Sequence, residues 1–270
     1  MRNTDQYLSL DDVRIRFRDE GSGPVVVMVH GWTLDLQMWD PQVAGMRDSF
    51  RIIRLDRRGF GLSSGRPSPM DDISDIARLC KYLELRRVAL VGMSQGVRAA
   101  LGFAAIASPM ISCLILDGPP EIGRKAPAGE DDIPIDYYRT LIRTDGIDAF
   151  RREWTAHPLV ALSTKDLGVR ALLQGMISRY PGKDLADPAP NAEPRSIAEP
   201  IDSLHVPMLL ITGEYETEQR TQAANDLAAG SPEAVRAVIR GAGHLSNLDN
   251  PSEYNAILSA FLRRHASPLF

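Results

Sequence analysis

The segment Val88–Gly96 constrains the fold of this chain more than any other feature of the sequence. Its first part, Val88–Val91, is a continuous apolar run of strand length, and a helical pattern follows directly after Gly96. Between them, Gly92 and Gly96 stand two residues before and two residues after Ser94, where a sharp strand-to-helix turn has no room for side chains. The positive end of the helix dipole also favours negative charge on a residue at this position. The pattern therefore predicts that Ser94 is a nucleophile, with a simple N-capping serine as the alternative.

Strand-length apolar runs alternate with helical patterns along most of the chain. This alternation is typical of a mostly parallel, doubly wound sheet flanked by helices, and we expect an α/β fold. The expected strands are Val13–Arg18, Pro24–His30, Arg51–Leu55, Val88–Val91, Met110–Leu116, Val206–Thr212 and Val235–Ile239, and the clearest helices are Met70–Tyr82, Ser94–Ala107 and Pro251–Arg264.

A long helical insertion interrupts this alternation. From Pro119 to about Pro200 no buried-strand run occurs, and three amphipathic stretches take its place. They are Tyr137–Arg143, Ile147–Thr155 and Lys165–Tyr180. We therefore expect one core, residues 1–120 and 197–270, with a helical cap, residues 121–196, inserted after the sixth strand.

A serine nucleophile needs a general base, because its hydroxyl is a weak nucleophile at neutral pH. Among the five histidines, His244 lies in a glycine-rich loop after the last strand and before the last helix. In a doubly wound sheet this loop lies at the carboxyl ends of the strands, on the same edge as Ser94. The sequence therefore predicts that His244 is the base.

At this point the chain resembles the α/β-hydrolase family over nearly its whole length. The matching segments are His30–Trp32, Asp56–Ser63, Gly92–Gly96 and Gly241–His244, and the tail Gly241–Asn255 is similar to that of 3-oxoadipate enol-lactonases and small esterases. The resemblance implies a serine–histidine–acid triad. It also implies an oxyanion hole formed by the backbone N–H groups of Trp32 and Gln95, with His30 shaping the loop.

Two residues are candidates for the acid. In related sequences an aspartate follows the strand predicted at Val206–Thr212, and here Glu216 takes its position in the turn that begins at Gly213. A glutamate can still orient the imidazole and stabilise its charged form. The alternative is Asp117, at the end of the run Met110–Leu116, which some family members use and which otherwise caps a turn.

Composition excludes several other classes of function. A net charge of −4 and a pI near 5.8 argue against nucleic-acid binding. No apolar run is long enough for a membrane span, and neither a metal cluster nor a phosphate-binding glycine loop is present in the sequence, so we expect no cofactor. Two cysteines with apolar neighbours suggest buried thiols in a cytoplasmic protein. The expected partner is a small-molecule substrate, and the oligomeric state stays open, a homodimer included.

The nucleophile defines the expected chemistry. Ser94 implies acyl transfer through an acyl-enzyme, and the resemblance of the tail favours a small carboxylic ester or lactone. A non-hydrolytic reaction on the same scaffold, such as C–C bond cleavage, a lyase reaction or cofactor-free oxygenation, is the alternative, and a ligand receptor is a third possibility. In the cap, the candidates for pocket residues are Tyr137, Tyr138, Trp154 and His157, which packing between cap and core also explains.

Overall fold

A single eight-stranded sheet organises the computed structural model, which describes residues 4–122, 133–187 and 204–266. The spatial order of the strands is β1-β2-β4-β3-β5-β6-β7-β8. β2 pairs antiparallel with β1 and β4, and every other pair is parallel, which confirms the expected mostly parallel sheet. The strands are β1 (Gln6–Leu10), β2 (Val13–Gly21), β3 (Val25–Val29), β4 (Arg51–Leu55), β5 (Val88–Met93), β6 (Ile111–Asp117), β7 (Met208–Gly213) and β8 (Ala234–Ile239).

Only β1 lies outside the predicted strands. It is an edge strand of five residues in which only Leu8 is buried, and its apolar alternation, Leu8 and Leu10, is too short to predict a strand. The central strands are buried on both faces, since parallel strands are covered by helices on either side.

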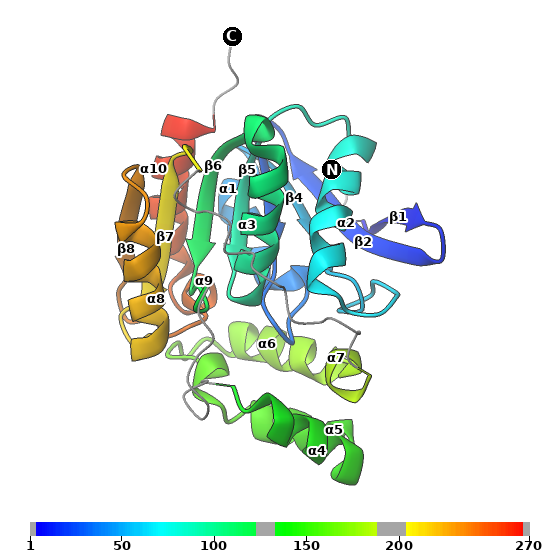
Figure 1. The fold of residues 1–270 in the computed structure, drawn as a ribbon. Coiled ribbons are helices and arrows are strands. Elements are labelled where there is room, and N and C mark those ends of the chain that lie inside the picture. The colour runs from blue at the N-terminus through cyan, green and yellow to red at the C-terminus, as the bar shows by residue number, and fades with distance from the viewer. Residues whose placement is uncertain (1–3, 123–132, 188–203, 267–270) are drawn as a thin grey trace.

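Successive residues of the central strands enter two separate cores. In β3, Val26 and Met28 face one core, whereas Val27 and Val29 face the other. The first core is covered by α1 (Asp40–Met46) and α10 (Pro251–His265), and the second by α2 (Pro69–Tyr82), α3 (Gln95–Ala107) and α8 (Glu218–Ala229). Figure 1 shows α2, α3 and α8 together in front of the sheet. The short helices η1 (Leu36–Trp39), η2 (Ser108–Met110) and α9 (Ser246–Asp249) complete the core.

A group of helices lies between β6 and β7 in the chain, as expected for a cap inserted after the sixth strand. It comprises α4 (Ile135–Asp145), α5 (Ile147–Trp154), η3 (Pro158–Val160), α6 (Leu167–Arg179) and α7 (Lys183–Ala186). These helices gather beyond the carboxyl ends of the parallel strands (Figure 1). The second boundary of the expected cap, between residues 196 and 197, lies outside the described residues.

Aromatic packing and a few polar contacts hold the cap on the core. Trp32, in the loop after β3, packs edge-on against Trp154 with ring centroids 4.8 Å apart. Its indole N–H donates to Asp184 of α7 at 2.6 Å, and the Trp154 indole N–H donates to Thr33 at 2.8 Å. In the same loop, Asp35 pairs with Arg179 of α6 at 2.8 Å. The loop that follows β3 is therefore fixed from both the core and the cap.

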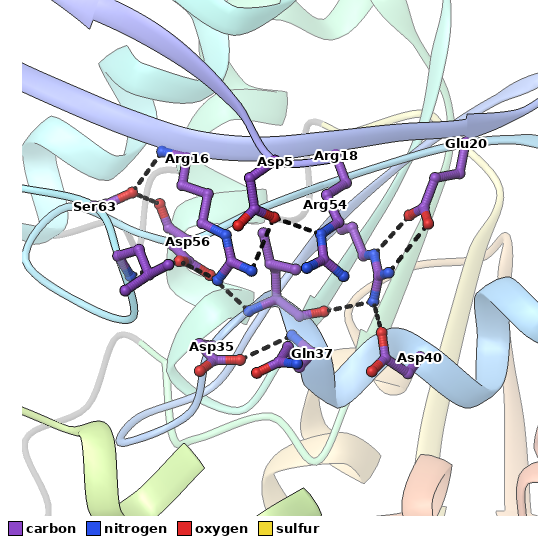
Figure 2. A network of polar contacts seen from close by, with 12 residues as sticks. Asp5, Arg16, Arg18, Glu20, Asp35, Gln37, Asp40, Arg54, Asp56 and Ser63 are labelled. Atoms are coloured by element: carbon purple, nitrogen blue, oxygen red, sulfur yellow. Dashed lines mark hydrogen bonds and ion pairs between the residues drawn. The ribbon is translucent and has the colours of Figure 1, made fainter. Parts of the chain in front are cut away.

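A buried network of arginines and carboxylates fixes the loops beside that segment. Asp56, at the end of β4, accepts hydrogen bonds from the backbone N–H groups of Leu36 and Leu62, and from Arg16 at 3.1 Å. Figure 2 shows this group continuing to Arg54, which binds Glu20. Burial, and next the charge of Asp35, raise the pKa of Asp56 to about 6. The motif segment Asp56–Ser63 thus acts as a structural brace for the edge that carries Ser94.

Candidate active site

Ser94 occupies a strained turn between β5 and α3. Its backbone has φ +50° and ψ −119°, a conformation that non-glycine residues rarely adopt and that is characteristic of a nucleophile elbow. A Cβ at Gly92 would lie 2.6 Å from the carbonyl oxygen of Gly96, and one at Gly96 would lie 2.6 Å from that of Val29. The two glycines of the motif are thus required by close backbone approach. The neighbouring strand β6 fixes the elbow, because the Ser94 N–H donates to the Asp117 carbonyl at 2.8 Å.

The loop after β3 runs beside this elbow. A Cβ at Gly31 would come within 3.3 Å of the Ser94 Cβ, so the two segments are in contact. Among the described residues, the backbone N–H groups of Trp32 and Gln95 donate no hydrogen bond. Gln95 is the first residue of α3, where an N–H has no partner within the helix. Two unpaired donors therefore flank Ser94.

His30 shapes this loop, as expected. One ring nitrogen, Nδ1, lies 2.7 Å from the Gly31 carbonyl and donates to it, while Nε2 accepts from the backbone N–H of Arg57 at 2.8 Å. Burial, and next the nearby charge of Arg57, lower the pKa of His30 to about 3. The ring is therefore neutral, and it joins the loop after β3 to the loop after β4.

His244 and Glu216 form a buried pair. The imidazole Nδ1 lies 2.7 Å from Glu216 Oε2, and the other carboxylate oxygen accepts from the Thr217 N–H at 2.9 Å. Burial alone would raise the pKa of Glu216, but His244, this N–H group and Arg220 hold it below its ordinary value. Glu216 is therefore a carboxylate, and it leaves Nε2 of the imidazole as the free ring nitrogen.

Asp117 lies close to this pair but faces another way. It is fully buried, its Oδ1 accepts from the hydroxyl of Ser246 at 3.2 Å, and its carboxyl group also interacts with the hydroxyl of Tyr254 in α10. Burial, and next the charge of Glu216, raise the pKa of Asp117 to about 8, so this carboxyl is protonated at neutral pH. It is the neighbouring residue, Gly118, that contacts the imidazole, because a Cβ there would lie 2.6 Å from His244 Cε1.

Asp249 supports the loop that carries His244. Its Oδ2 accepts from the Gly243 N–H at 2.8 Å, and its Oδ1 accepts from the Thr164 N–H of the cap at 2.9 Å. The same loop lies against the end of β7, since a Cβ at Gly213 would be 2.1 Å from the Gly243 carbonyl oxygen. The position of the imidazole is thus set from both the core and the cap.

Ser94 and His244 line one small pocket between core and cap. The remaining lining is mostly apolar and consists of Trp32, Leu34, Met93, Ile133, Trp154, Leu159, Val160 and Leu245. In the described parts of the chain no hydrogen bond joins His244 to the Ser94 hydroxyl. Such bonds are often long in ligand-free enzymes and tighten when substrate binds.

Of the four cap residues expected in the pocket, Trp154 lines it and the other three do not. Tyr137 is half exposed and its hydroxyl donates to Glu153 at 2.8 Å. Tyr138 is buried in the aromatic cluster around Trp32, with its ring edge-on to Phe150. Packing between cap and core therefore accounts for Tyr138, whereas Tyr137 contacts another residue of the cap. His157 stacks on Trp154 behind the pocket wall.

Two arginines near Ser94 were not anticipated from the sequence. Arg57 donates to the Gln95 side chain at 2.7 Å and to Asp72 at 2.8 Å, which fixes the residue after the serine. Arg220, in the first turn of α8, donates to the Ser94 hydroxyl oxygen at 3.3 Å. A cation in the first turn of a helix interacts unfavourably with the helix dipole. This unfavourable position is the one feature of the sequence that could have indicated a role for Arg220.

Within residues 4–122, 133–187 and 204–266, no group of three or more histidine, cysteine or acidic side chains is placed to hold a metal ion. In the same residues no helix is long and apolar enough to cross a membrane. Both cysteines are buried thiols, as expected, and burial raises the pKa of each to about 12.

Comparisons with known proteins identify the family and the fold. A model of the alpha/beta hydrolase family matches residues 26–257. The putative 2-succinyl-6-hydroxy-2,4-cyclohexadiene-1-carboxylate synthase of Bacillus subtilis is 29% identical, over 93% of this chain and 96% of its own length. Among solved structures, a thermophilic esterase from Thermogutta terrifontis superposes with a TM-score of 0.81 at 24% identity, covering 98% of this chain and all of its own. An enol-lactonase from Burkholderia xenovorans gives 0.79 at 22% identity, covering 96% and 100%.

Proposed function

Because this chain belongs to the alpha/beta hydrolase family, we propose that it is a serine hydrolase that acts on a small carboxylic ester or lactone through an acyl-enzyme on Ser94. The observation that carries the proposal is the 2.7 Å contact between His244 and Glu216 beside a pocket that contains both His244 and Ser94. A histidine oriented by a carboxylate next to a serine is the arrangement that nucleophilic acyl transfer needs.

In the proposed first half-reaction, Nε2 of His244 takes the hydroxyl proton of Ser94 as Oγ attacks the substrate carbonyl. The carbonyl oxygen becomes an oxyanion that the N–H groups of Trp32 and Gln95 stabilise, and such a donor contributes on the order of 3 kcal/mol. His244 then gives its proton to the leaving alkoxide, and the acyl group stays on Oγ. Glu216 stabilises the imidazolium throughout.

In the second half-reaction, His244 removes a proton from water, and the resulting hydroxide attacks the acyl carbon. The bond between Oγ and carbon breaks, and Oγ recovers its proton from His244. The products are a carboxylic acid and an alcohol, or one hydroxy acid from a lactone. The apolar lining of the pocket favours a substrate whose groups next to the ester are small and uncharged.

A panel of short p-nitrophenyl esters and small lactones, assayed with the wild-type protein and with Ser94→Ala, tests the proposal. We expect wild-type turnover and a loss of at least about 10³-fold in kcat in the variant. In H₂¹⁸O, one labelled oxygen should enter the acid product. Equal turnover by Ser94→Ala would disprove the role of Ser94.

A second candidate is a non-hydrolytic reaction at the same site. The Bacillus relative, which matches over nearly its whole length, is named as a synthase rather than a hydrolase. Product formation that depends on Ser94 but incorporates no oxygen from water would favour this candidate over hydrolysis.

A further inference from the structure

Arg220 is a buried cation in contact with the atom that we propose as the nucleophile. Its side chain projects from the first turn of α8, four residues after Glu216, and is 4% exposed. One terminal nitrogen, Nη1, donates to Ser94 Oγ at 3.3 Å and to the Gly118 carbonyl oxygen at 3.4 Å. The guanidinium therefore reaches the nucleophile from the side of β6 and β7.

The position of Arg220 is energetically unfavourable for a residue with only a packing role. Burying a guanidinium is unfavourable unless other groups compensate its charge, and the first turn of a helix repels a cation. Part of the compensation comes from Glu216, whose carboxylate interacts with the charge of Arg220.

Arg220 also determines how the serine hydroxyl is used. A guanidinium has only donors, so the contact occupies a lone pair of Oγ and leaves the hydroxyl hydrogen to point elsewhere. His244 lines the same pocket and offers its free Nε2 as an acceptor. The contact thus leaves the hydroxyl hydrogen of Ser94 available to His244.

The charge on Oγ changes during the proposed reaction. It is small in the hydroxyl and in the acyl-enzyme, and larger in the two transition states in which the bond to the acyl carbon forms or breaks. A charged donor that remains on Oγ therefore binds the transition states more strongly than the ground states. The guanidinium keeps its own protons in both steps.

We propose that Arg220 is a catalytic residue that stabilises negative charge on Ser94 Oγ during acylation and deacylation. This inference rests on the proposed serine nucleophile. Because Arg220 does not line the pocket, it acts on the nucleophile from behind and makes no contact with the substrate. Its loss should therefore lower kcat and leave KM nearly unchanged.

The test compares Arg220→Met with Arg220→Lys and with a matched control, Arg236→Gln. Arg236 is a partly buried arginine on β8 that donates to Thr212, away from Ser94. Two rates are measured: phosphonylation of Ser94 by a neutral fluorophosphonate, and turnover of a short p-nitrophenyl ester. Thermal denaturation checks that each variant is folded.

We expect Arg220→Met to lower both the phosphonylation rate and kcat by about 10- to 100-fold with KM within about threefold, as for the loss of one charged hydrogen bond. Arg220→Lys should recover part of the loss, and Arg236→Gln should match the wild type. A folded Arg220→Met protein that reacts at the wild-type rate, or that changes only KM, overturns the proposal. If Arg220→Met does not fold, Arg220→Gln takes its place under the same criteria.

The two readouts separate this inference from the proposed function. If the wild-type protein is phosphonylated at Ser94 but hydrolyses no ester or lactone, the proposed substrate class fails and the phosphonylation rates still test Arg220. If Ser94 of the folded wild-type protein does not react at all, both proposals fail.

Discussion

The ends of two neighbouring strands, β6 and β7, carry acidic residues that differ in nearly every physical respect. After β7, Glu216 is a carboxylate that lies 2.7 Å from His244 and has its pKa held below the ordinary value. At the end of β6, Asp117 is protonated at neutral pH, with a pKa of about 8, and contacts Ser246 instead. Both side chains are buried, so burial alone does not decide which acid contacts the His244 imidazole.

The direction of each side chain accounts for the difference. Side chains alternate along β6, and Cys113 and Ile115 face the core covered by α1 and α10. The carboxyl group of Asp117 therefore lies on this same face of the sheet. Glu216 lies past the end of β7 in a turn, where the chain is free of the strand alternation. The longer glutamate side chain then reaches the imidazole directly. A carboxyl group on a strand must lie on the face that the strand alternation gives it, whereas the backbone of a turn allows other side-chain directions.

The largest effect that tests this comparison is on turnover. Glu216→Gln should lower kcat by about 10³- to 10⁴-fold, because the amide cannot stabilise the imidazolium or fix its tautomer. Asp117→Asn, the matched change at the other strand end, should keep kcat within about threefold, since it replaces a neutral carboxyl by a neutral amide. Steady-state kinetics of both purified variants on the same ester measures the difference. A larger loss in Asp117→Asn than in Glu216→Gln would reverse the assignment of the acid.

The next effect is on stability against pH. The pKa of Asp117 is about 8 in the folded protein and near 3.8 when it is unfolded, so between these values the folded state keeps a proton that the unfolded state has lost. The stabilisation is complete below pH 3.8 and declines as the pH rises to about 8. Between pH 6 and 8 the loss is up to roughly 1.4 kcal/mol per pH unit. Urea unfolding at pH 6, 7 and 8 should show this decline in the wild type.

Asp117→Asn is the control for that titration, because asparagine has no proton to lose in this range. Its free energy of unfolding should change less than that of the wild type between pH 6 and 8. If the free energies of unfolding of the two proteins change with pH in parallel, Asp117 is ionised at neutral pH. Asp117 and Glu216 would then not differ in charge.

The smallest effect concerns the contact between Asp117 and the loop of His244. Ser246→Ala removes the hydroxyl that lies 3.2 Å from Asp117 Oδ1 and should cost about 1 kcal/mol of stability. Because Asp249 also supports this loop, kcat should fall by no more than about threefold. Ser231→Ala is the matched control, since Ser231 is buried and its hydroxyl has no partner among the described residues. If Ser246→Ala loses no more free energy of unfolding than Ser231→Ala, the contact between Ser246 and Asp117 contributes nothing to stability.

The sequence by itself determined the α/β-hydrolase fold and the position of the elbow. The apolar runs predict the strands of an α/β fold, Gly92 and Gly96 mark the turn around Ser94, and the resemblance of four motif segments to α/β-hydrolases specifies the family. The family match confirms the fold. The edge strand β1 escaped notice because its residues are mostly exposed and its apolar alternation is too short.

Tertiary structure alone decided which distant side chains meet. The direction of Asp117 depends on the register of β6 in the sheet, and the contact between Arg220 and Ser94 joins residues 126 positions apart. The burial of Tyr138 and the exposure of its neighbour Tyr137 depend on how the cap packs against Trp32. A local pattern records which way a residue faces within its own element, but contacts between elements depend on how those elements dock, and no single segment carries that information.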